Sequence, residues 1–328
     1  MPDRVTSQAV AEKAGVSRSA VSRVFTPGAS VAPKTAERVR AIADEMGYRP
    51  NVLARGLLTG RSRMIGLVVA YLDNQFYPGA LDKLSAALEA RGYHVLIFMA
   101  AQAADNVEEV AEDILDYQVD GLILASVTLS SNLAARCRAR GVPVVLFNRH
   151  QSDGELSVTS DNNTGGRLAA RHLIARGARK IGHIAGWEGA STQADREAGF
   201  LAELTVAGLS CHARAVGDFR PETARAAARK MFAGPDHPDA IFVANDYMAF
   251  PVMDVIRHEK GLSIPEDVAI VGFDDVPVAC WPSYDLTTIR QDSGAMVDAT
   301  VAALIASVEG DTPAPALIPV ELVKRGSA

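Results

Sequence analysis

The chain has 328 residues, of which 48% are hydrophobic and 22% are charged, so it is long enough to form two or three domains with a sizeable core. The sequence contains no low-complexity tract and no apolar run of membrane-spanning length, which excludes a disordered or membrane-embedded chain. The net charge of −6 is unevenly distributed, because residues 1–63 hold eleven basic and five acidic residues while the remainder is acidic. A basic head on an acidic body indicates a polyanion-binding module attached to a domain with another task, unless the clustering arose by chance.

The three cysteines, Cys137, Cys211 and Cys280, lie far apart and form no Cys-x-x-Cys pair. This usage is typical of reduced cysteines that pack inside a cytoplasmic protein. The amino-terminal residues also lack the charged and then apolar pattern of a secretory signal peptide. We therefore expect a cytoplasmic protein with no membrane segment.

The first predicted elements are two short helices joined by a turn. Thr6 can cap a helix over residues 7–14, Gly15 suits a tight turn, and Ser17 can cap a second helix. Two short helices joined by a glycine-containing turn form a helix-turn-helix motif. A third helix is predicted over residues 33–47, because its apolar residues recur at helical spacing.

The second predicted helix, over residues 17–25, has two unlike faces. At about 100° per residue, one continuous sector holds Arg18, Ser19, Ser22 and Arg23. The opposite sector holds Ala20, Val21, Val24 and Phe25. Arginine can pair bidentately with guanine, and serine can donate or accept a hydrogen bond, so the polar sector has the chemistry to read base edges.

The stretch that follows Tyr48 is short for a helix. Pro50 ends the preceding helix and Asn51 can cap a new one, but only about two turns fit before Thr59-Gly60. One interpretation is a hinge helix that becomes ordered on DNA, with Leu57 as an apolar wedge in the minor groove. The other is a linker whose leucines dock on a neighbouring domain, and the residues alone leave both open.

A collinear set of residues covers about the first 60 positions of the chain. The set is Val5-Thr6, Val10-Ala11, Ala14-Gly15-Val16-Ser17, Val21-Ser22-Arg23-Val24, Gly47-Tyr48-Arg49-Pro50-Asn51, Ala54-Arg55, Leu57, Gly60-Arg61 and Ile65-Gly66. It resembles the lactose-repressor (LacI) family of bacterial transcription regulators. Among its departures from the family pattern, Ala20 stands where threonine is common and Gly56 stands where a better helix former is common.

The resemblance implies which residues of the head contact DNA. Base contacts are expected from Arg18, Ser19, Ser22 and Arg23. Contacts to DNA phosphates are expected from Thr6, Ser17, Lys34, Arg49, Asn51, Arg55 and Arg61. Minor-groove hinge contacts are expected from Leu53, Ala54 and Leu57, and Leu53 would also pack against its counterpart in a dimer partner. The implied DNA is a double-stranded, pseudo-palindromic operator.

From Met64 onward, short apolar runs alternate with amphipathic helical stretches, which predicts parallel sheets covered by helices on both faces. One open sheet of this length would be unusually wide, so we expect an α/β body with two lobes. The predicted domains are an all-α helix-turn-helix head at 1–49, a hinge helix and linker at 50–63, and a body at 64–328. Within the body we assign residues 64–160 and 288–328 to a first lobe and residues 161–287 to a second.

Further matching motifs lie in the body: Asp161-Asn162, Gly165-Gly166, Arg196, Gly199-Phe200, Ala244-Asn245-Asp246, Val271-Gly272-Phe273-Asp274-Asp275, Leu286-Thr287-Thr288-Ile289 and Gln291. With them the resemblance implies a fold like that of the type I periplasmic binding proteins, with a small effector in the cleft between the lobes. The matching cleft positions are Phe76, Tyr77, Arg149, Thr192, Arg196, Phe219, Asn245, Asp274 and Gln291.

These cleft positions suit a polar, ring-shaped ligand such as a sugar. An aromatic side chain can stack on an apolar sugar face, and carboxylate, amide and guanidinium groups can bind several hydroxyls. If Arg149 and Arg196 both enter the cleft, an anionic ligand such as a sugar acid becomes an alternative. Structural interpretations stay open as well: Asp274 can cap a helix, Phe219 can belong to the core, and Arg196 can pair with a carboxylate on its own helix.

The sequence favours a ligand-responsive transcriptional regulator, in particular a repressor of carbohydrate-utilisation genes, over two other classes. The basic head and the missing signal peptide disfavour a sugar receptor whose head binds protein. The chain has no dinucleotide-binding, phosphate-loop, zinc-protease or hydrolase motif, and its seven histidines are dispersed, so we expect no enzyme, metal or cofactor. No leucine heptad follows the last predicted strand, which predicts a homodimer rather than a coiled-coil tetramer.

Overall fold

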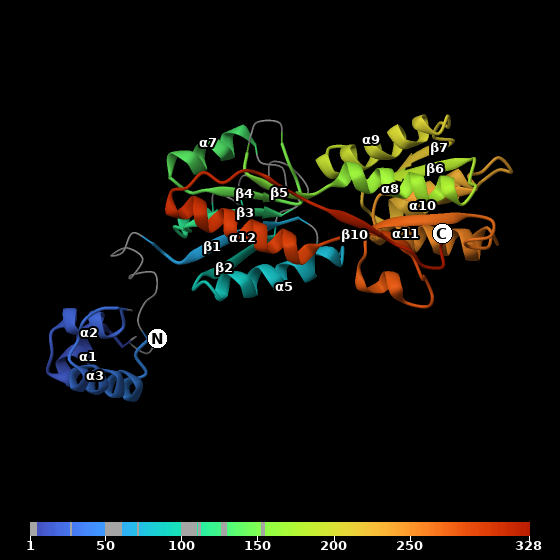
Figure 1. The fold of residues 1–328 in the computed structure, drawn as a ribbon. Coiled ribbons are helices and arrows are strands. Elements are labelled where there is room, and N and C mark those ends of the chain that lie inside the picture. Colours follow the sequence, from blue (N-terminus) through green and yellow to red (C-terminus); the bar gives the residue numbers. More distant parts are fainter. Residues whose placement is uncertain are drawn as a thin grey trace. The chain divides into compact units, whose positions relative to one another are not determined.

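The computed structural model describes residues 5–26, 28–49, 61–70, 72–99, 110, 113–125, 130–151 and 155–328. The chain divides into two compact units, Met1–Arg63 and Met64–Ala328, which we call the head and the body (Figure 1). Within the described part of the chain, no helix combines the length and the apolar character that a membrane crossing needs.

The described residues of the head form three helices on a small apolar core. Their bounds are α1 (Ser7–Ala14), α2 (Arg18–Val24) and α3 (Pro33–Met46). Helix α2 begins where the Ser17 hydroxyl accepts a 3.2 Å hydrogen bond from the amide of Ala20. Helix α1 ends at Gly15, whose φ of 62° is a left-handed conformation that glycine adopts without strain. The inward side chains of α2, Val21 and Val24, are buried, and the expected helix-turn-helix is therefore present.

The first lobe of the body is a six-stranded parallel sheet in the order β11-β5-β4-β3-β1-β2. Its strands are β1 (Met64–Val69), β2 (His94–Met99), β3 (Gly121–Ala125), β4 (Val144–Phe147), β5 (Ser157–Ser160) and β11 (Ala316–Ile318). Among the residues that the structure describes here, the longer helices are α5 (Phe76–Glu89), α7 (Ser131–Ala139) and α12 (Ser293–Glu309). Alternate residues of the strands pack in two separate cores, one under α5 and α12 and the other under α7, so helices cover both faces.

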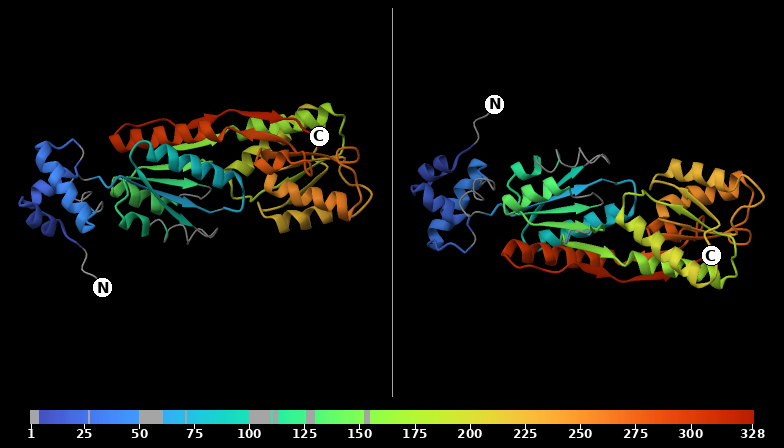
Figure 2. Two further views of the ribbon diagram at one scale, coloured as in Figure 1. Left: turned by 90° about the horizontal axis from the view of Figure 1, so that it is seen from below. Right: turned by 90° about the horizontal axis from the view of Figure 1, so that it is seen from above.

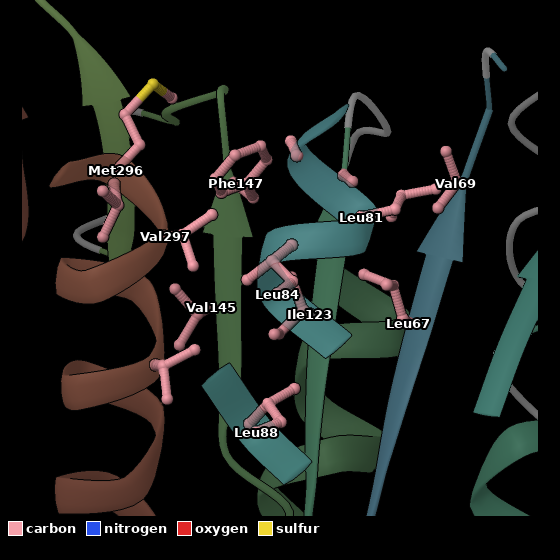
Figure 3. Close-up of a cluster of buried hydrophobic side chains, with 14 of the residues drawn as sticks. Leu67, Val69, Leu81, Leu84, Leu88, Ile123, Val145, Phe147, Met296 and Val297 are labelled. Carbon is pink, nitrogen blue, oxygen red and sulfur yellow. The ribbon is translucent and has the colours of Figure 1, made fainter. Parts of the chain in front are cut away.

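Figure 3 shows one of these cores in detail. Three leucines of α5, Leu81, Leu84 and Leu88, recur at helical spacing and point at the sheet, where they meet Leu67 and Ile123. Helix α12 contributes Met296 and Val297 to the same core. Burial of this apolar stripe holds α5 in place and fixes the loop that precedes it, between β1 and α5.

The second lobe is a six-stranded sheet in the order β12-β10-β9-β8-β6-β7, parallel except for the pairing of β12 with β10. Its strands are β6 (Ile181–Ala185), β7 (Ala213–Val216), β8 (Ala240–Val243), β9 (Ala269–Asp274), β10 (Thr287–Gln291) and β12 (Val320–Val323). Its helices are α8 (Asn162–Ala175), α9 (Ser191–Val206), α10 (Pro221–Met231) and α11 (Asp246–Asp254), with a π-helical turn at Val255–Glu259 and a 3-10 turn at Pro277–Cys280. Helices α8 and α9 cover one face and α10 and α11 the other.

The chain crosses between the lobes three times. It passes from β5 to α8 near residue 161, from β10 to α12 near residue 292, and from β11 to β12 at Pro319. Figure 2 shows the last crossing as the red segment that runs from the first lobe to the carboxyl terminus on the second. Three crossings leave the lobes joined along one side, so the carboxyl ends of their strands face a common cleft.

The carboxyl-terminal segment corrects the expected lobe boundary. The sequence pattern predicts residues 288–328 in the first lobe, but β10 pairs with β9 and β12 pairs with β10, so both strands belong to the second lobe. Only α12 and β11 return to the first lobe. The chain changes sheets at Pro319, which lacks the amide proton that a continuous strand would need for pairing. Ser327 and Ala328 are buried against the second lobe.

Candidate nucleic-acid interface and ligand cleft

Helix α2 presents a polar face to solvent. Arg18, Ser19, Ser22 and Arg23 are all exposed, while Val21 and Val24 on the opposite face are buried. The Arg18 Nε donates a 3.1 Å hydrogen bond to the Ser7 hydroxyl, which holds this arginine near the amino-terminal end of α1. The face thus carries two guanidinium groups and two hydroxyls on one rigid helix, as base-edge contacts require.

The residues expected to contact DNA phosphates lie before and after α2 in the sequence. Thr6 and Ser17 are exposed and use their hydroxyls to cap α1 and α2. Lys34 and Arg49, the other two expected phosphate contacts among the described residues before the linker, have exposed cationic side chains. The Arg49 guanidinium lies 3.8 Å from the Asp44 carboxylate. Arg61 is also exposed. Asn51, Leu53, Ala54, Arg55 and Leu57 lie outside the described residues.

A cavity of about 350 Å³, a volume that includes its open mouth, lies between the lobes of the body. Its lining residues are Asn74, Tyr77, Asn148, Arg149, Thr192, Arg196, Phe219, Asn245 and Asp274. Eight of them follow the carboxyl ends of strands β1, β4, β6, β7 and β8, and Asp274 is the last residue of β9; ligands of open α/β sheets bind at these strand ends. Seven of the nine positions expected at the cleft are therefore in its wall.

The other two expected cleft residues have different positions. Phe76 is buried in the first-lobe core, where its ring stacks on Phe147 with centroids 6.4 Å apart. It is the first residue of α5, and the helix directs its side chain toward the sheet while the next residue, Tyr77, faces the cavity. Gln291 lies behind the wall and donates a 2.7 Å hydrogen bond to the Asp274 carboxylate, so it supports the site without lining it.

Asn74 and Asn148 line the cavity but were missed in the sequence. The Asn74 side chain donates to the Asp274 carboxylate at 3.3 Å, and the Asn148 side chain donates to the Tyr77 hydroxyl at 3.1 Å. The Asn148 Oδ1 is buried and has no hydrogen-bond partner among the described residues. A buried amide oxygen of this kind can accept a hydrogen bond from an ordered water or from a ligand in the cavity. Asn74 follows β1 and Asn148 follows β4. Their positions after the carboxyl ends of strands are the sequence signal that could have predicted them as cleft residues.

Arg196 is fixed on several sides within the second lobe. Its Nε donates to the Asn162 side chain at 2.9 Å, and one of its terminal nitrogens donates to the Ala244 carbonyl at 2.6 Å. The guanidinium also lies 3.6 Å from the Phe273 ring centroid and 3.6 Å from the Asp274 carboxylate. Burial lowers the pKa of Arg196, and the nearby Asp274 carboxylate opposes that shift.

The carboxylates beside Arg196 on its own helix have other partners, which answers the structural alternative for this arginine. Asp195 lies 2.6 Å from the His150 ring, and Glu197 lies 2.5 Å from the Arg214 guanidinium. Arg196 therefore faces the cleft rather than the outer surface of α9, and its side chain is only 3% exposed.

Asp274 ends strand β9 and is buried in the cavity wall. Burial raises its pKa to about 6, although the guanidinium of Arg196 and the amides of Asn74 and Gln291 favour the ionised form. It does not cap a helix, which was its structural alternative, because its oxygens accept from side chains of both lobes. A carboxylate in this position can accept hydrogen bonds from ligand hydroxyls.

Two further residues shape the wall. Arg149 follows β4 and donates to the Thr192 hydroxyl in α9, which joins the two lobes across the cleft. Phe219 follows β7, is half-buried, and packs at the edge of the second-lobe core, so it is neither wholly core nor wholly exposed. Its ring lies over Gly186, where a Cβ atom would stand 2.2 Å away, so a larger residue at that position would displace it.

Two protein-family models match the chain. The model of bacterial regulatory proteins of the lacI family matches residues 6–51, and that of the periplasmic binding protein-like domain matches residues 170–328. The chain is 32% identical to the HTH-type transcriptional regulator CelR of Thermobifida fusca, over 97% of this chain and 96% of that protein. It is 29% identical to the ribose operon repressor of Escherichia coli K12, over 92% of each.

Solved structures agree with these relatives. A Lac repressor dimer bound to operator and the anti-inducer ONPF has a TM-score of 0.90 at 29% identity, over 99% of both chains. A complex of the regulator CelR with cellobiose has a TM-score of 0.75 at 30% identity, over 99% of this chain and 100% of that one. These similar proteins are regulators of transcription rather than enzymes, and the helix-turn-helix head and two-lobed body expected from the sequence are confirmed.

Proposed function

Since the chain belongs to the lacI family of bacterial regulatory proteins, it is a DNA-binding transcriptional regulator, and we propose that it is a repressor whose operator affinity is set by a small sugar-like effector. The observation that carries this proposal is the exposed face of two arginines and two serines on α2. These four side chains contribute no packing to the core of the head, and their hydrogen-bonding groups are suited to contact base edges.

The DNA contacts divide into two kinds. Base contacts come from Arg18, Ser19, Ser22 and Arg23, and phosphate contacts from Thr6, Ser17, Lys34, Arg49, Asn51, Arg55 and Arg61. The first set specifies the sequence, and the second positions the head and makes binding depend on salt. A hinge formed by Leu53, Ala54 and Leu57 inserts into the minor groove.

The effector binds in the cavity between the lobes. Phe219 supplies an apolar surface for a sugar ring, and Asp274 accepts from its hydroxyls. Asn245 uses its Oδ1 to cap α11, accepting from the Met248 amide at 3.0 Å, so its NH₂ group is the part that can donate to the ligand. Because both lobes contribute to the wall, an occupant favours one degree of closure over another and thereby changes operator affinity.

The regulator acts as a homodimer in the cytoplasm, on a pseudo-palindromic operator. Support for the dimer comes from β2, the last strand of the first-lobe sheet, whose Ile97 and Met99 are 52% and 49% exposed. An apolar strand at the edge of a sheet invites pairing with a second copy. Support for the location comes from the task, because an operator is reached only inside the cell.

A selection experiment tests this function. Duplexes with a randomised core are selected on the full chain, and binding to the selected site and to a scrambled site is measured by fluorescence anisotropy between about 50 and 200 mM salt. We expect at least about a thousandfold preference for the selected site and weaker binding to both at higher salt. Equal affinity for the two sites would rule out sequence-specific regulation.

A further inference from the structure

A group of polar contacts ties the two lobes of the body together beside the cavity. We propose that Arg149 and His150, which follow β4 of the first lobe, form a strap that fastens this lobe to helix α9 of the second lobe and sets how far the body closes. The strap consists of the protein's own side chains and is independent of which ligand the cavity binds. It therefore goes beyond the proposed function, although it acts at the same cleft.

Three hydrogen bonds make up the strap. The guanidinium of Arg149 donates to the Thr192 hydroxyl. The backbone amide of His150 donates to the Ser191 hydroxyl at 3.1 Å, and its ring Nε2 donates to the Asp195 carboxylate at 2.6 Å. All three acceptors belong to the first five residues of α9. Two successive residues of one lobe thus hold one short stretch of a helix in the other.

The strap is anchored on its first-lobe side. Asn148, the residue between β4 and the strap, has a φ of 58°, a left-handed conformation that asparagine adopts more easily than most residues. Its side chain donates to the Tyr77 hydroxyl of α5 at 3.1 Å. Phe147, the last residue of β4, is buried in the core under α5. The segment that carries the strap is therefore held by both β4 and α5.

The strap is also anchored on its second-lobe side. Arg196, which follows the last acceptor of the strap, donates to the Asn162 side chain at 2.9 Å and to the Ala244 carbonyl at 2.6 Å. Phe200, one turn further along α9, is fully buried in the second-lobe core. A hydrogen bond between two segments that are already fixed costs little conformational entropy, so it can restrain the lobes.

The lobes also meet at an apolar contact, which differs from the strap in kind. Val276, which follows β9 of the second lobe, is buried in the first-lobe core, and Phe250 of α11 packs against the cores of both lobes. Apolar contact has no preferred direction, whereas a hydrogen bond requires its donor and acceptor to be aligned. The strap therefore selects one relative position of the lobes, and the apolar contact alone tolerates several.

The strap extends from the cavity wall to the surface. Arg149 and Thr192 belong to the wall and are buried, while the side chains of His150 and Asp195 are 42% and 34% exposed. Water competes for the exposed pair, so this pair contributes little by itself. The buried Thr192 hydroxyl gives Arg149 an acceptor that only the closed body offers. Loss of both contacts should therefore open the body further than loss of either one.

The distance between the lobes in the ligand-free full chain tests the strap. Spin labels are attached to exposed positions of α7 and α9 through Ala135→Cys and Thr205→Cys, in a chain that also carries Cys211→Ser and Cys280→Ser. Labelled chain is mixed with an excess of unlabelled chain, so that each measured pair of labels lies within one molecule. Double electron–electron resonance then gives the distribution of label distances, and thermal unfolding checks that each variant folds.

We expect Asp195→Ala to raise the ratio of longer to shorter distances by about two- to fivefold, the range that loss of an exposed ion pair allows. Thr192→Val, which keeps the shape of the side chain and removes its hydroxyl, should raise the ratio more, and the two changes together should raise it most. The control is Glu259→Ala, which breaks an ion pair of similar exposure with Arg229 inside the second lobe and should leave the distances unchanged. The strap is overturned if the double variant keeps the distances of the parent, or if the control opens the body as far.

An exchange of the two exposed residues tests the contact between them. His150→Asp and Asp195→His should each open the body, because each leaves two like groups opposite one another. The chain that carries both changes has an imidazole and a carboxylate again and should return toward the distances of the parent. Opening that persists in this chain would overturn the role of the His150–Asp195 contact.

The strap and the proposed function fail in different ways. If the opened variants bind the selected operator as tightly as the parent, the strap stands and closure does not control DNA binding. If the distances never change while the chain still prefers the selected duplex, the strap is overturned and the regulator remains.

Discussion

At the scale of single residues, Arg23 is the clearest test of base readout. It is exposed on α2, whereas Arg18 is partly engaged by the Ser7 hydroxyl, so Arg23 is the guanidinium more open to a base. Arg23→Ala should cost about 1–3 kcal/mol at the selected operator and much less on scrambled DNA, because a lost base contact removes discrimination. Anisotropy titrations on the two duplexes measure this difference.

The control for this experiment is Arg40→Ala, which removes an exposed arginine from α3. It should lower affinity for both duplexes by a similar small factor, if at all, because it changes only the general attraction to phosphates. If Arg23→Ala weakens binding to both duplexes equally, Arg23 contacts the backbone rather than a base.

The buried Asp274 gives a prediction about pH. Its pKa in the folded protein is about 6, above the ordinary value of 3.8, so the folded state binds a proton more tightly than the unfolded state. Stability contributed at this site is therefore present at pH 4, is lost as the pH rises toward 6, and stays lost above it. Asp274→Asn, which resembles the protonated acid, should match the parent near pH 4 and exceed its stability by about 3 kcal/mol near pH 7.

Urea unfolding of both proteins from pH 4 to 7 measures that difference. Distant titrating groups largely cancel in it, whereas the buried Asp246 does not, because burial and the Asp274 charge both raise its pKa and the substitution removes the second cause. One of the groups that cancel is His183, whose burial lowers its pKa to about 4 and which therefore adds a slope of opposite sign to each curve. Asp298→Asn, at an exposed position on α12, is the control. A difference that falls with rising pH would mean that the attraction of Arg196 outweighs the burial of Asp274.

The sequence predicts which residues follow the strand ends and so lie near the site. It does not predict which of these side chains face the cavity. Arg149, Arg196 and Asp274 are among the expected cleft positions, and the geometry places all three in one wall. Asn148 was missed because an amide that follows a strand is also a common turn residue, and only the fold reveals that its Oδ1 is buried. Phe76 was wrongly expected in the wall, because adjacent helix residues point in different directions and the first turn decides which one faces the cavity.

At the scale of elements, the cap of α2 holds the reading face in place. The helix has only seven residues, and a helix of that length is marginal without its cap and its packing. Ser17→Ala removes the acceptor for the Ala20 amide and should destabilise α2 by about 1 kcal/mol. Hydrogen exchange of α2 amides in the DNA-free chain should then be about fivefold faster.

The matched control is Ser30→Ala, which removes an exposed serine from the loop before α3. The N-cap of α3 is Ala32, so this change removes no cap and should leave exchange in all three helices as it was. Exchange of α2 that is unchanged in Ser17→Ala would show that packing of Val21 and Val24 alone holds the helix.

The ends of helices could be predicted from the sequence more reliably than the pairing of strands within the sheets. Caps at Thr6 and Ser17 and the glycine ends of α1 and α3 are local signals, and the structure has them where they were expected. The choice of sheet for a strand is not local. Residues 320–323 satisfy an apolar alternation equally well in either lobe, and only pairing with β10 assigns them to the second.

At the scale of the whole molecule, the exposed edge of β2 leads to a prediction about assembly. A single helix of seven residues offers few base contacts, whereas two linked heads raise the effective concentration of the second head on its half-site. Ile97→Asp combined with Met99→Asp places charges on that edge and should convert a dimer to a monomer. Light scattering coupled to size-exclusion chromatography measures the mass, and anisotropy measures operator affinity.

The same change should weaken operator binding by about a hundredfold or more, because a monomer loses the second head, while binding of the effector in the cavity is retained. Val206→Asp is the control, since Val206 is 79% exposed at the end of α9 and a charge there tests exposure of an apolar side chain without the strand edge. A double variant that still has the mass of a dimer would place the interface on another surface. A monomer that binds the operator as tightly as the parent would show that one head suffices, which would remove the physical reason for a pseudo-palindromic site.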